Sequence, residues 1–308
     1  EVARIATPTA GPGEVLVRVA AAGVSRAAMH LLTGTPYLLR LAGFGLRAPK
    51  QPVVGVEVAG VVAAVGAGVT GFAQGDEVFG YASGGCAELA VSKASKLAHK
   101  PAELTFVEAA ALVDSASTAL QGVRDHAGVR AGQRVLVLGG SGGVGSFAVQ
   151  VAADAGAEVT ATAQTAKVDF VRSLGAAHVV DHTTTDPLAV DQPYDVIIDI
   201  GGNRPVRLLR KALAADGTLV IVGGEGGGRV TGGFQRQLLA PLRGIGGSQR
   251  LKTFVASEDA ETLDELAALA VAGRLRPAVD RTHPLADGAE AFRRMAAESD
   301  LVLVEGAG

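Results

Sequence analysis

The chain has 308 residues, enough for two domains of ordinary size, and 48% of them are hydrophobic, which is ample material for a buried core. Its net charge of −3 argues against a nucleic-acid partner, and no apolar run reaches the roughly 20 residues of a membrane-spanning helix. No signal peptide is visible, and the single cysteine, Cys86, excludes an internal disulfide. We therefore expect a cytoplasmic protein that binds neither nucleic acid nor membrane.

The first hundred residues are predicted to be rich in strands and turns. Residues 14–20 alternate as a strand does, residues 53–65 are almost continuous in Val, Ala and Gly, and residues 87–91 form another strand-like run. Glycines separate these runs as turns. Short strands at this spacing are typical of a small irregular barrel rather than of βαβ units.

Beyond Pro101 the pattern changes to alternating strands and helices. Thr105 and Glu108 have the spacing of a capping box, which predicts that a helix begins there. Strands are then expected at 134–138, 157–163, 194–200 and 217–222, with helices at 144–155, 166–174, 203–214 and 258–272, and a final helix and strand at 286–297 and 301–304. This alternation predicts an α/β fold with a doubly wound parallel sheet of the Rossmann type.

The most informative stretch covers residues 135–156. A buried strand is followed by a turn with Gly140, Gly142 and Gly145 in G-x-G-x-x-G spacing, and then by a helix that ends near Gly156. Glycines let backbone amides approach phosphates, and the positive end of the helix dipole faces them. A purely structural turn is the alternative. The predicted pyrophosphate site comprises Gly140, Ser141, Gly142, Gly143, Val144 and Gly145.

The same region carries a family resemblance. Gly132-Gln133, Leu136, the glycine turn and Gln150 match the nucleotide-binding signature of the zinc-free branch of the medium-chain dehydrogenase/reductases, although Ala153 stands where a Lys, Arg or Ser is usual. The branch includes quinone oxidoreductases and NAD(P)-dependent alcohol dehydrogenases. Further resembling blocks are 13–19, 21–24, 35–41, 55–60, 75–80, 118–121, 171–176 and 248–251.

The resemblance implies two domains with a catalytic cleft at their junction. A GroES-like β-barrel domain would comprise 1–103 and 278–308, and a Rossmann NAD(P)-binding domain would comprise 104–277. Family members usually carry about one more strand pair ahead of the segment that begins here. Their tail also has a Gly-Lys before its last strand, which this chain lacks after Met295.

A catalytic zinc ion is not expected. Zinc-dependent relatives have a Cys where this chain has Ser25 and a His where it has Val56, so only Glu57 of that set remains. One carboxylate cannot hold zinc. Without a Lewis acid, oxidation of a simple alcohol is harder, whereas reduction of a quinone, an enone or a reactive carbonyl is easier.

The cofactor preference depends on the residues after the second parallel strand. An NAD-specific protein places an acid there for the ribose 2′-hydroxyl, but this strand ends at Ala163-Gln164. Thr165 and Lys167 follow, and they would hold a 2′-phosphate through a hydroxyl and an ammonium. NADPH is therefore favoured over NADH, and the alternative for Lys167 is a solvent-facing lysine on a helix.

The remaining site residues are expectations from the resemblance. The adenosine half of the cofactor would lie near Asp199 and Gly201, and the nicotinamide near Gly223 and Gly224, although glycines after strands are also ordinary turns. Ser248 and Thr118 would contact the nicotinamide side, with simple packing as the alternative for Thr118.

The acid–base residues are expected near the cleft. Tyr37 is the candidate proton donor or oxyanion partner, its alternative being a loop aromatic that covers the barrel. Ser25 is expected to line the cleft, and Met29 and Arg40 would shape the acceptor pocket.

Three functions are compatible with these features. The first is a zinc-independent, NADPH-dependent reductase of a quinone or an α,β-unsaturated carbonyl. The second is a zinc-free alcohol dehydrogenase or aldehyde reductase, and the third is a non-catalytic nucleotide-binding protein of the crystallin or scaffold kind. A homodimer is also expected, with residues 253–256 as the candidate edge strand.

Overall fold

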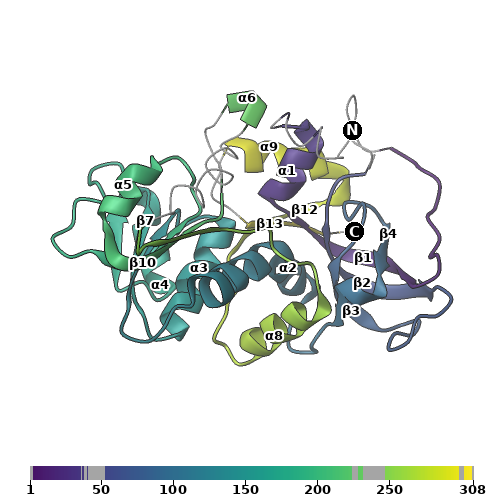
Figure 1. Cartoon of the computed structure of the whole chain (residues 1–308). Coiled ribbons are helices and arrows are strands. Elements are labelled where there is room, and N and C mark those ends of the chain that lie inside the picture. Colours follow the sequence, from purple (N-terminus) through teal and green to yellow (C-terminus); the bar gives the residue numbers. More distant parts are fainter. Residues whose placement is uncertain are drawn as a thin grey trace. The chain divides into compact units, whose positions relative to one another are not determined.

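The protein is described here by a computed structural model, which covers residues 3–35, 37, 40, 53–223, 228–231, 247–297 and 302–306. Its internal contacts divide the chain into two compact units (Figure 1). Unit 1 comprises Glu1–Gly34, Arg40–Ser117 and Ser257–Gly308, and unit 2 comprises Thr35–Leu39 and Thr118–Ala256.

Unit 1 is built on a seven-stranded sheet. Its strands are β1 (Glu14–Val24), β2 (Glu57–Val65), β3 (Glu77–Tyr81), β4 (Leu89–Lys93), β5 (Leu97–His99), β12 (Val279–Pro284) and β13 (Val302–Gly306). The order is β12-β13-β1-β2-β3-β5, and β4 also pairs with β1. All of these pairs are antiparallel except β12 with β13. Gly23 of β1 and Tyr81 of β3 lie opposite Glu57 of β2 on either side.

The described helices that begin in unit 1 are α1 (Arg26–Thr33), η2 (Ala94–Lys96), α2 (Phe106–Leu120), α8 (Ala260–Val271), η5 (Leu285–Asp287) and α9 (Gly288–Ala297). Side chains of Ser25, Thr105 and Asp259 cap the starts of α1, α2 and α8. The predicted capping box is confirmed: the Glu108 carboxylate accepts from the Thr105 amide at 2.9 Å, and the Glu108 amide donates to the Thr105 hydroxyl at 3.2 Å. These two bonds satisfy amides that a helix start leaves unpaired.

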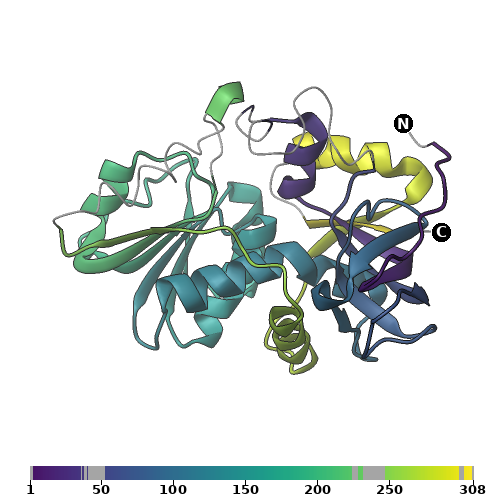
Figure 2. The ribbon, with the colours of Figure 1, turned by 45° about the vertical axis from the view of Figure 1, so that its right-hand side comes forward.

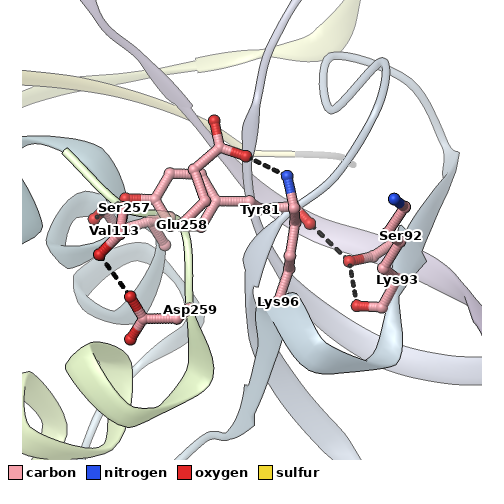
Figure 3. A network of polar contacts seen from close by, with 8 residues as sticks. All are labelled: Tyr81, Ser92, Lys93, Lys96, Val113, Ser257, Glu258 and Asp259. Carbon is pink, nitrogen blue, oxygen red and sulfur yellow. Dashed lines mark hydrogen bonds and ion pairs between the residues drawn. The ribbon is translucent and has the colours of Figure 1, made fainter. Parts of the chain in front are cut away.

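Helix α8 packs into the core of unit 1. Leu263 and Ala267 belong to the same buried cluster as Phe79 of β3 and the alanines of α2. The segment before α8 is held in place as well, because Lys96 pairs with Glu258 (Figure 3). Asp259 also accepts from the Thr262 amide at 2.8 Å. These contacts place α8 in unit 1. The Rossmann domain expected from the sequence, residues 104–277, would include α8, and those domain boundaries stay a prediction.

Unit 2 contains a six-stranded parallel sheet, which confirms the predicted sheet (Figure 2). Its strands are β6 (Arg134–Leu138), β7 (Glu158–Ala163), β8 (His178–Asp181), β9 (Tyr194–Asp199), β10 (Leu213–Ile221) and β11 (Arg250–Thr253), in the order β11-β10-β9-β6-β7-β8. η3 (Gln121–Ala127) precedes β6, and α3 (Gly143–Asp154), η4 (Thr165–Lys167), α4 (Val168–Ser173), α5 (Val206–Lys211) and α6 (Gly228–Thr231) lie between the strands.

Two predicted elements of unit 2 differ in extent. The helix expected at 203–214 covers only Val206–Lys211, because it begins after Pro205 and the chain turns into β10 at Leu213. The edge strand expected at 253–256 lies at Arg250–Thr253 instead. Phe254 leaves the sheet and stacks on the His126 ring, with 4.1 Å between the ring centroids. None of the described helices combines the length and apolar character that a membrane crossing requires.

Candidate functional site

The carboxyl ends of the parallel strands in unit 2 bring several predicted residues together. The turn after β6 bonds to its neighbour β7, because the Gly139 amide donates to the Thr162 hydroxyl and the Gly140 amide to the Thr162 carbonyl, both at 2.9 Å. On the other side, the Gly201 amide, after β9, donates to the Leu138 carbonyl at 3.2 Å. Ligands of doubly wound sheets bind at this edge of the sheet.

The glycines of the predicted phosphate loop differ in whether the fold requires them. A Cβ on Gly145 would lie 1.9 Å from the Gly139 carbonyl oxygen, so only glycine lets α3 approach the loop. A Cβ on Gly140 would lie 2.9 Å from the Ala161 methyl group. Gly142 is different, because its φ of −80° suits any residue and its nearest neighbour would be 3.5 Å away. Neither backbone strain nor internal packing requires glycine at position 142.

Gly201 repeats the situation of Gly142 on the neighbouring turn. A Cβ there would meet nothing within 4 Å, and Gly201 is not among the glycines with a positive φ. Gly223, after β10, is needed for packing, since its Cβ would lie 1.9 Å from the Ile200 carbonyl oxygen. Asp199 is fully buried, and its carboxylate accepts from the Gly202 amide at 3.0 Å. Asp199 therefore shapes the turn.

An acidic residue lies beside the predicted 2′-phosphate site. Asp181 ends β8 in register with Ala163 of β7, and its carboxylate accepts from the Thr165 hydroxyl at 2.5 Å. The other carboxylate oxygen accepts from the Thr183 amide at 2.9 Å. These hydrogen bonds, that from Thr165 first, lower the pKa of Asp181, so the carboxylate is ionised at neutral pH. Lys167 is half-buried on the adjacent turn.

Four predicted residues lie elsewhere or outside the described residues. Ser248 precedes β11, so it lies at the amino edge of the sheet, where its hydroxyl donates to the Ala215 carbonyl. That position speaks against a role at the carboxyl edge. Thr118 is half-buried on α2, and Tyr37 exposes 41% of its surface. Gly224 lies outside the described residues.

Unit 1 contains a second group of polar residues, around Ser25. Ser25 caps α1, its hydroxyl accepting from the Ala28 amide at 3.5 Å, and it is only 7% exposed. Its hydroxyl also hydrogen-bonds to the carboxyl groups of Glu57 and Asp114. Glu57 is 2% exposed, and Asp114, on α2, is half-buried. The hydroxyl thus lies between two carboxyl groups from different elements.

Both carboxyl groups hold their protons more tightly than usual. Burial, and then the negative charge of Asp114, raise the pKa of Glu57 to about 8. Burial, and then the charge of Glu258, raise the pKa of Asp114 to about 6. In both cases the hydrogen bond from Ser25 opposes the rise. At pH 7 the two carboxyl groups therefore hold one proton between them, and they titrate as a pair.

The sequence analysis missed Asp114 and Asp181. Asp114 stands among apolar residues in the middle of α2, and an acid in such a run is the one signal that could have singled it out. The sequence around Asp181 gave no such signal, because Asp181 reaches Thr165 only through the pairing of β8 with β7.

Comparison with known proteins agrees with this geometry. Residues 11–162 match the family described as alcohol dehydrogenase GroES-like domain, and residues 174–300 match the family described as zinc-binding dehydrogenase. The chain is 30% identical over 308 residues to a chloroplast envelope quinone oxidoreductase homolog from Arabidopsis thaliana, covering 94% of this chain and 88% of the relative. The chain belongs to the medium-chain dehydrogenase/reductase superfamily, in its quinone-oxidoreductase-like branch.

Other members of this superfamily extend the comparison. The chain is 35% identical over 295 residues to the spectinabilin polyketide synthase system protein NorB from Streptomyces orinoci, covering 92% of this chain but only 13% of that much longer protein. The crystal structure of the CurK enoyl reductase matches 99% of this chain and 94% of its own, with a TM-score of 0.84 and 26% identity. The predicted fold class, a Rossmann sheet with a GroES-like β domain, is confirmed. The chain is thus an oxidoreductase of the NAD(P)H-dependent kind.

The residues of unit 2 fit the nicotinamide dinucleotide that the superfamily uses. Gly142 and Gly201 lie on adjacent turns at the ligand-binding edge, and the space beside each of them is open. The amides of the first turn of α3 have no partner within their own helix, so they suit phosphate oxygens.

The residues of unit 1 do not fit the zinc ion that one family description implies. Protein zinc sites are built from thiolates, imidazoles and carboxylates, usually with at least three such ligands. Ser25, Glu57 and Asp114 offer only two carboxyl groups and a hydroxyl. Within the described ranges, no group of three or more His, Cys, Asp or Glu side chains is placed to hold a metal.

Proposed function

We propose that the chain is a zinc-independent, NADPH-dependent reductase that transfers a hydride to a quinone or an α,β-unsaturated carbonyl. The observation that carries the proposal is the pair of glycines, Gly142 and Gly201, which lie at the ligand-binding edge of the sheet where packing within the described residues does not require a glycine. When bound, the reduced nicotinamide supplies the hydride. The chain supplies position, a dry site and a proton.

Two observations support the acceptor class: the described residues offer no ligand set for a Lewis-acid metal, and similar proteins carry names that describe such acceptors. Hydride addition to a quinone or an enone spreads negative charge onto an oxygen, which hydrogen-bond donors can stabilise without a metal. One relative is named a quinone oxidoreductase homolog, and a similar structure is named an enoyl reductase. Both names describe reduction of a conjugated acceptor.

The cofactor preference rests on the turn after β7. No acid follows Ala163 directly, and Lys167 lies on the same turn with an ammonium group whose charge suits a 2′-phosphate. Asp181 acts in the opposite direction, because it accepts the hydroxyl hydrogen of Thr165 and would repel a phosphate. We propose that Lys167 outweighs it, so that NADPH binds more tightly than NADH.

The contacting residues we propose are the phosphate loop and the turns beside it. The pyrophosphate would be held by the amides of Ser141–Gly145, the adenosine half by the turn at Gly201, and the nicotinamide by the turn at Gly223. Tyr37 is proposed as the hydrogen-bond partner of the developing oxyanion. Its test is Tyr37→Phe, which should lower kcat and leave the affinity for NADPH unchanged.

A homodimer through the edge of the unit 2 sheet is also proposed. β11 is an edge strand, paired only with β10 among the described strands. An edge strand offers unpaired backbone groups to a second copy. A monomer mass by light scattering would refute this.

The test of the function is turnover against a panel of acceptors. Purified chain, NADPH and either a quinone, an enone, an enoyl thioester or an aldehyde should show oxidation above the acceptor-free background for at least one conjugated acceptor. An alcohol with NADP⁺ tests the reverse, alcohol-dehydrogenase activity. Tight nucleotide binding without turnover of any acceptor would refute the proposal and leave a non-catalytic nucleotide-binding protein.

A further inference from the structure

Turns at the carboxyl edge of the unit 2 sheet pack against each other through their backbones. They follow β6, β9 and β10, and β9 lies between the other two strands in the sheet. A Cβ on Gly139, after β6, would lie 3.3 Å from the amide nitrogen of Gly201, after β9. A Cβ on Gly223, after β10, would lie 1.9 Å from the Ile200 carbonyl oxygen. The turn after β9, residues 200–202, is therefore in contact with the turns on both sides of it.

The last residue of β9 holds this middle turn and one of its neighbours. The Asp199 carboxylate accepts from the Gly202 amide at 3.0 Å, and Gly202 has a φ of 63°, which favours glycine. The Asp199 carbonyl oxygen accepts from the Val222 amide at 3.0 Å and from the Gly223 amide at 3.3 Å. Asp199 thus fixes the middle turn through its side chain and the turn after β10 through its backbone.

An acid is an unexpected residue at this position. Asp199 is fully buried, and the three residues before it on β9, Val196, Ile197 and Ile198, are apolar and at most 1% exposed. Burying a carboxylate costs free energy unless hydrogen bonds replace the water that it loses. Packing alone does not call for a carboxylate at the end of this strand, whereas the hydrogen bond to the Gly202 amide needs an acceptor there.

The middle turn lies where the strand order of the sheet reverses. This reversal falls between β6 and β9, since β7 and β8 continue from β6 on one side and β10 and β11 continue from β9 on the other. Dinucleotides bind across the crevice at such a point. The middle turn carries Gly201, proposed to hold the adenosine half, and supports Gly223, proposed to hold the nicotinamide.

We propose that Asp199 is a positioning residue that sets the nicotinamide in place through the turn at residues 200–202. Its carboxylate holds the Gly202 amide, and the turn in turn supports Gly223 at the Ile200 carbonyl. Asp199 acts through the backbone and takes no part in the hydride transfer itself. The proposal rests on the proposed function, because it requires that a nicotinamide dinucleotide binds at this edge of the sheet.

The first test compares Asp199 with a matched control on the same strand. Asp195, near the opposite end of β9, also accepts a backbone amide, that of Arg134, at 2.8 Å. Asp199→Ala should lower kcat at saturating NADPH at least about tenfold, because a displacement of about 1 Å at the reacting atoms costs up to about 10²-fold. Asp195→Ala removes an equivalent hydrogen bond at the amino edge, so it should lower the Tm and leave kcat unchanged.

Asp199→Asn separates the hydrogen bond from the charge. The side-chain oxygen of asparagine accepts a backbone amide as a carboxylate oxygen does. Asp199→Asn should therefore keep most of the wild-type kcat, whereas Asp199→Ala should lose it. A merely structural role would act through stability alone, and the folded fraction of both variants would then turn over at the wild-type rate.

The second test needs no acceptor. The reduced nicotinamide is fluorescent, and its emission is polarised when the ring is held fixed in a protein. Because the chain contains no tryptophan, no tryptophan emission overlaps with this signal. With NADPH fully bound, the emission should be strongly polarised in the wild type, Asp199→Asn and Asp195→Ala. It should be less polarised in Asp199→Ala, because a loosened turn lets the ring move.

The outcomes separate the two proposals. A wild type that binds NADPH but reduces no acceptor would refute the proposed reductase, and the polarisation would still test the positioning role. A wild type that binds no nicotinamide nucleotide would refute both. Equal kcat and equal polarisation in Asp199→Ala and wild type would overturn the positioning role. An Asp199→Asn variant as impaired as Asp199→Ala would overturn it too, because the hydrogen bond would not be the cause.

If Asp199→Ala does not fold, hydrogen exchange in the wild type decides. The Gly202 amide should exchange slowly before any nucleotide is added, because the Asp199 carboxylate already holds the turn. A Gly202 amide that exchanges as fast as those of an unprotected loop would overturn the proposal.

Discussion

Replacing Glu57 by glutamine should change how the stability of the protein depends on pH. Glu57 has a pKa of about 8 in the folded protein and 4.5 as a free side chain. A raised carboxyl pKa means that the folded state binds a proton that the unfolded state has already released. The contribution of this proton to the free energy of unfolding is therefore fully present below pH 4.5, and it is lost as the pH rises towards 8.

The size of the effect follows from the shift. One bound proton corresponds to a loss of about 1.4 kcal/mol per pH unit between these two values. Over the whole interval of 3.5 units, 8 less 4.5, the loss approaches ~5 kcal/mol, a large part of the 5–15 kcal/mol that a domain usually has. Because Glu57 is 2% exposed, solvent screening does not reduce this figure substantially.

The assay is urea unfolding at pH 5.5, 7.0 and 8.5. Glutamine has a similar shape but no titrating proton. Between pH 5.5 and 7.0 its free energy of unfolding should therefore rise relative to that of the wild type by ~1.4 kcal/mol per pH unit, and this rise should level off near pH 8, the pKa of Glu57. Subtracting one curve from the other removes the groups that both proteins share. A difference between the two proteins that stays constant with pH would refute the inference that Glu57 is neutral when folded.

Three further predictions test the rest of the molecule. Gly142→Ala should leave the Tm within about 2 °C and weaken NADPH binding at least about tenfold, because its methyl group points into the space left for the ligand. Gly145→Ala should instead lower the free energy of unfolding by more than about 2 kcal/mol, because its Cβ would lie 1.9 Å from the Gly139 carbonyl oxygen. Calorimetry and nucleotide titration measure both effects, and equal effects of the two variants would contradict the assignment. Asp181→Asn should raise the affinity for NADPH relative to that for NADH, and Lys167→Ala should lower this ratio. If titrations give the wild type and both variants the same ratio of the two affinities, the 2′-phosphate binds elsewhere. Thr105→Ala should cost about 1 kcal/mol in urea unfolding by removing the capping box of α2, and no loss would mean that another group satisfies the same amides.

The elements were predictable where the signal is local. The capping box at Thr105 and Glu108 depends on residues three apart, and the strand, glycine turn and helix around Gly142 lie in one short stretch. Such features need no knowledge of distant neighbours.

The polar partners were not predictable, because tertiary pairing determines them. Asp114 meets Glu57 only through the packing of α2 against the sheet of unit 1, and Asp181 meets Thr165 only because β8 pairs with β7. Ser248 shows the converse: its sequence block suggested the cofactor, but the direction of β11 puts it at the opposite edge. Residue type alone does not say at which end of a strand a side chain will lie.

The close approach of Gly23 to Glu57 limits how the two positions can vary among descendants of this chain. A substituent at position 23 is tolerated only if position 57 gives up its long acid, since both compete for one volume. The two positions should therefore change together. Where position 23 carries a side chain, a long acid at position 57 must leave the volume that it fills here.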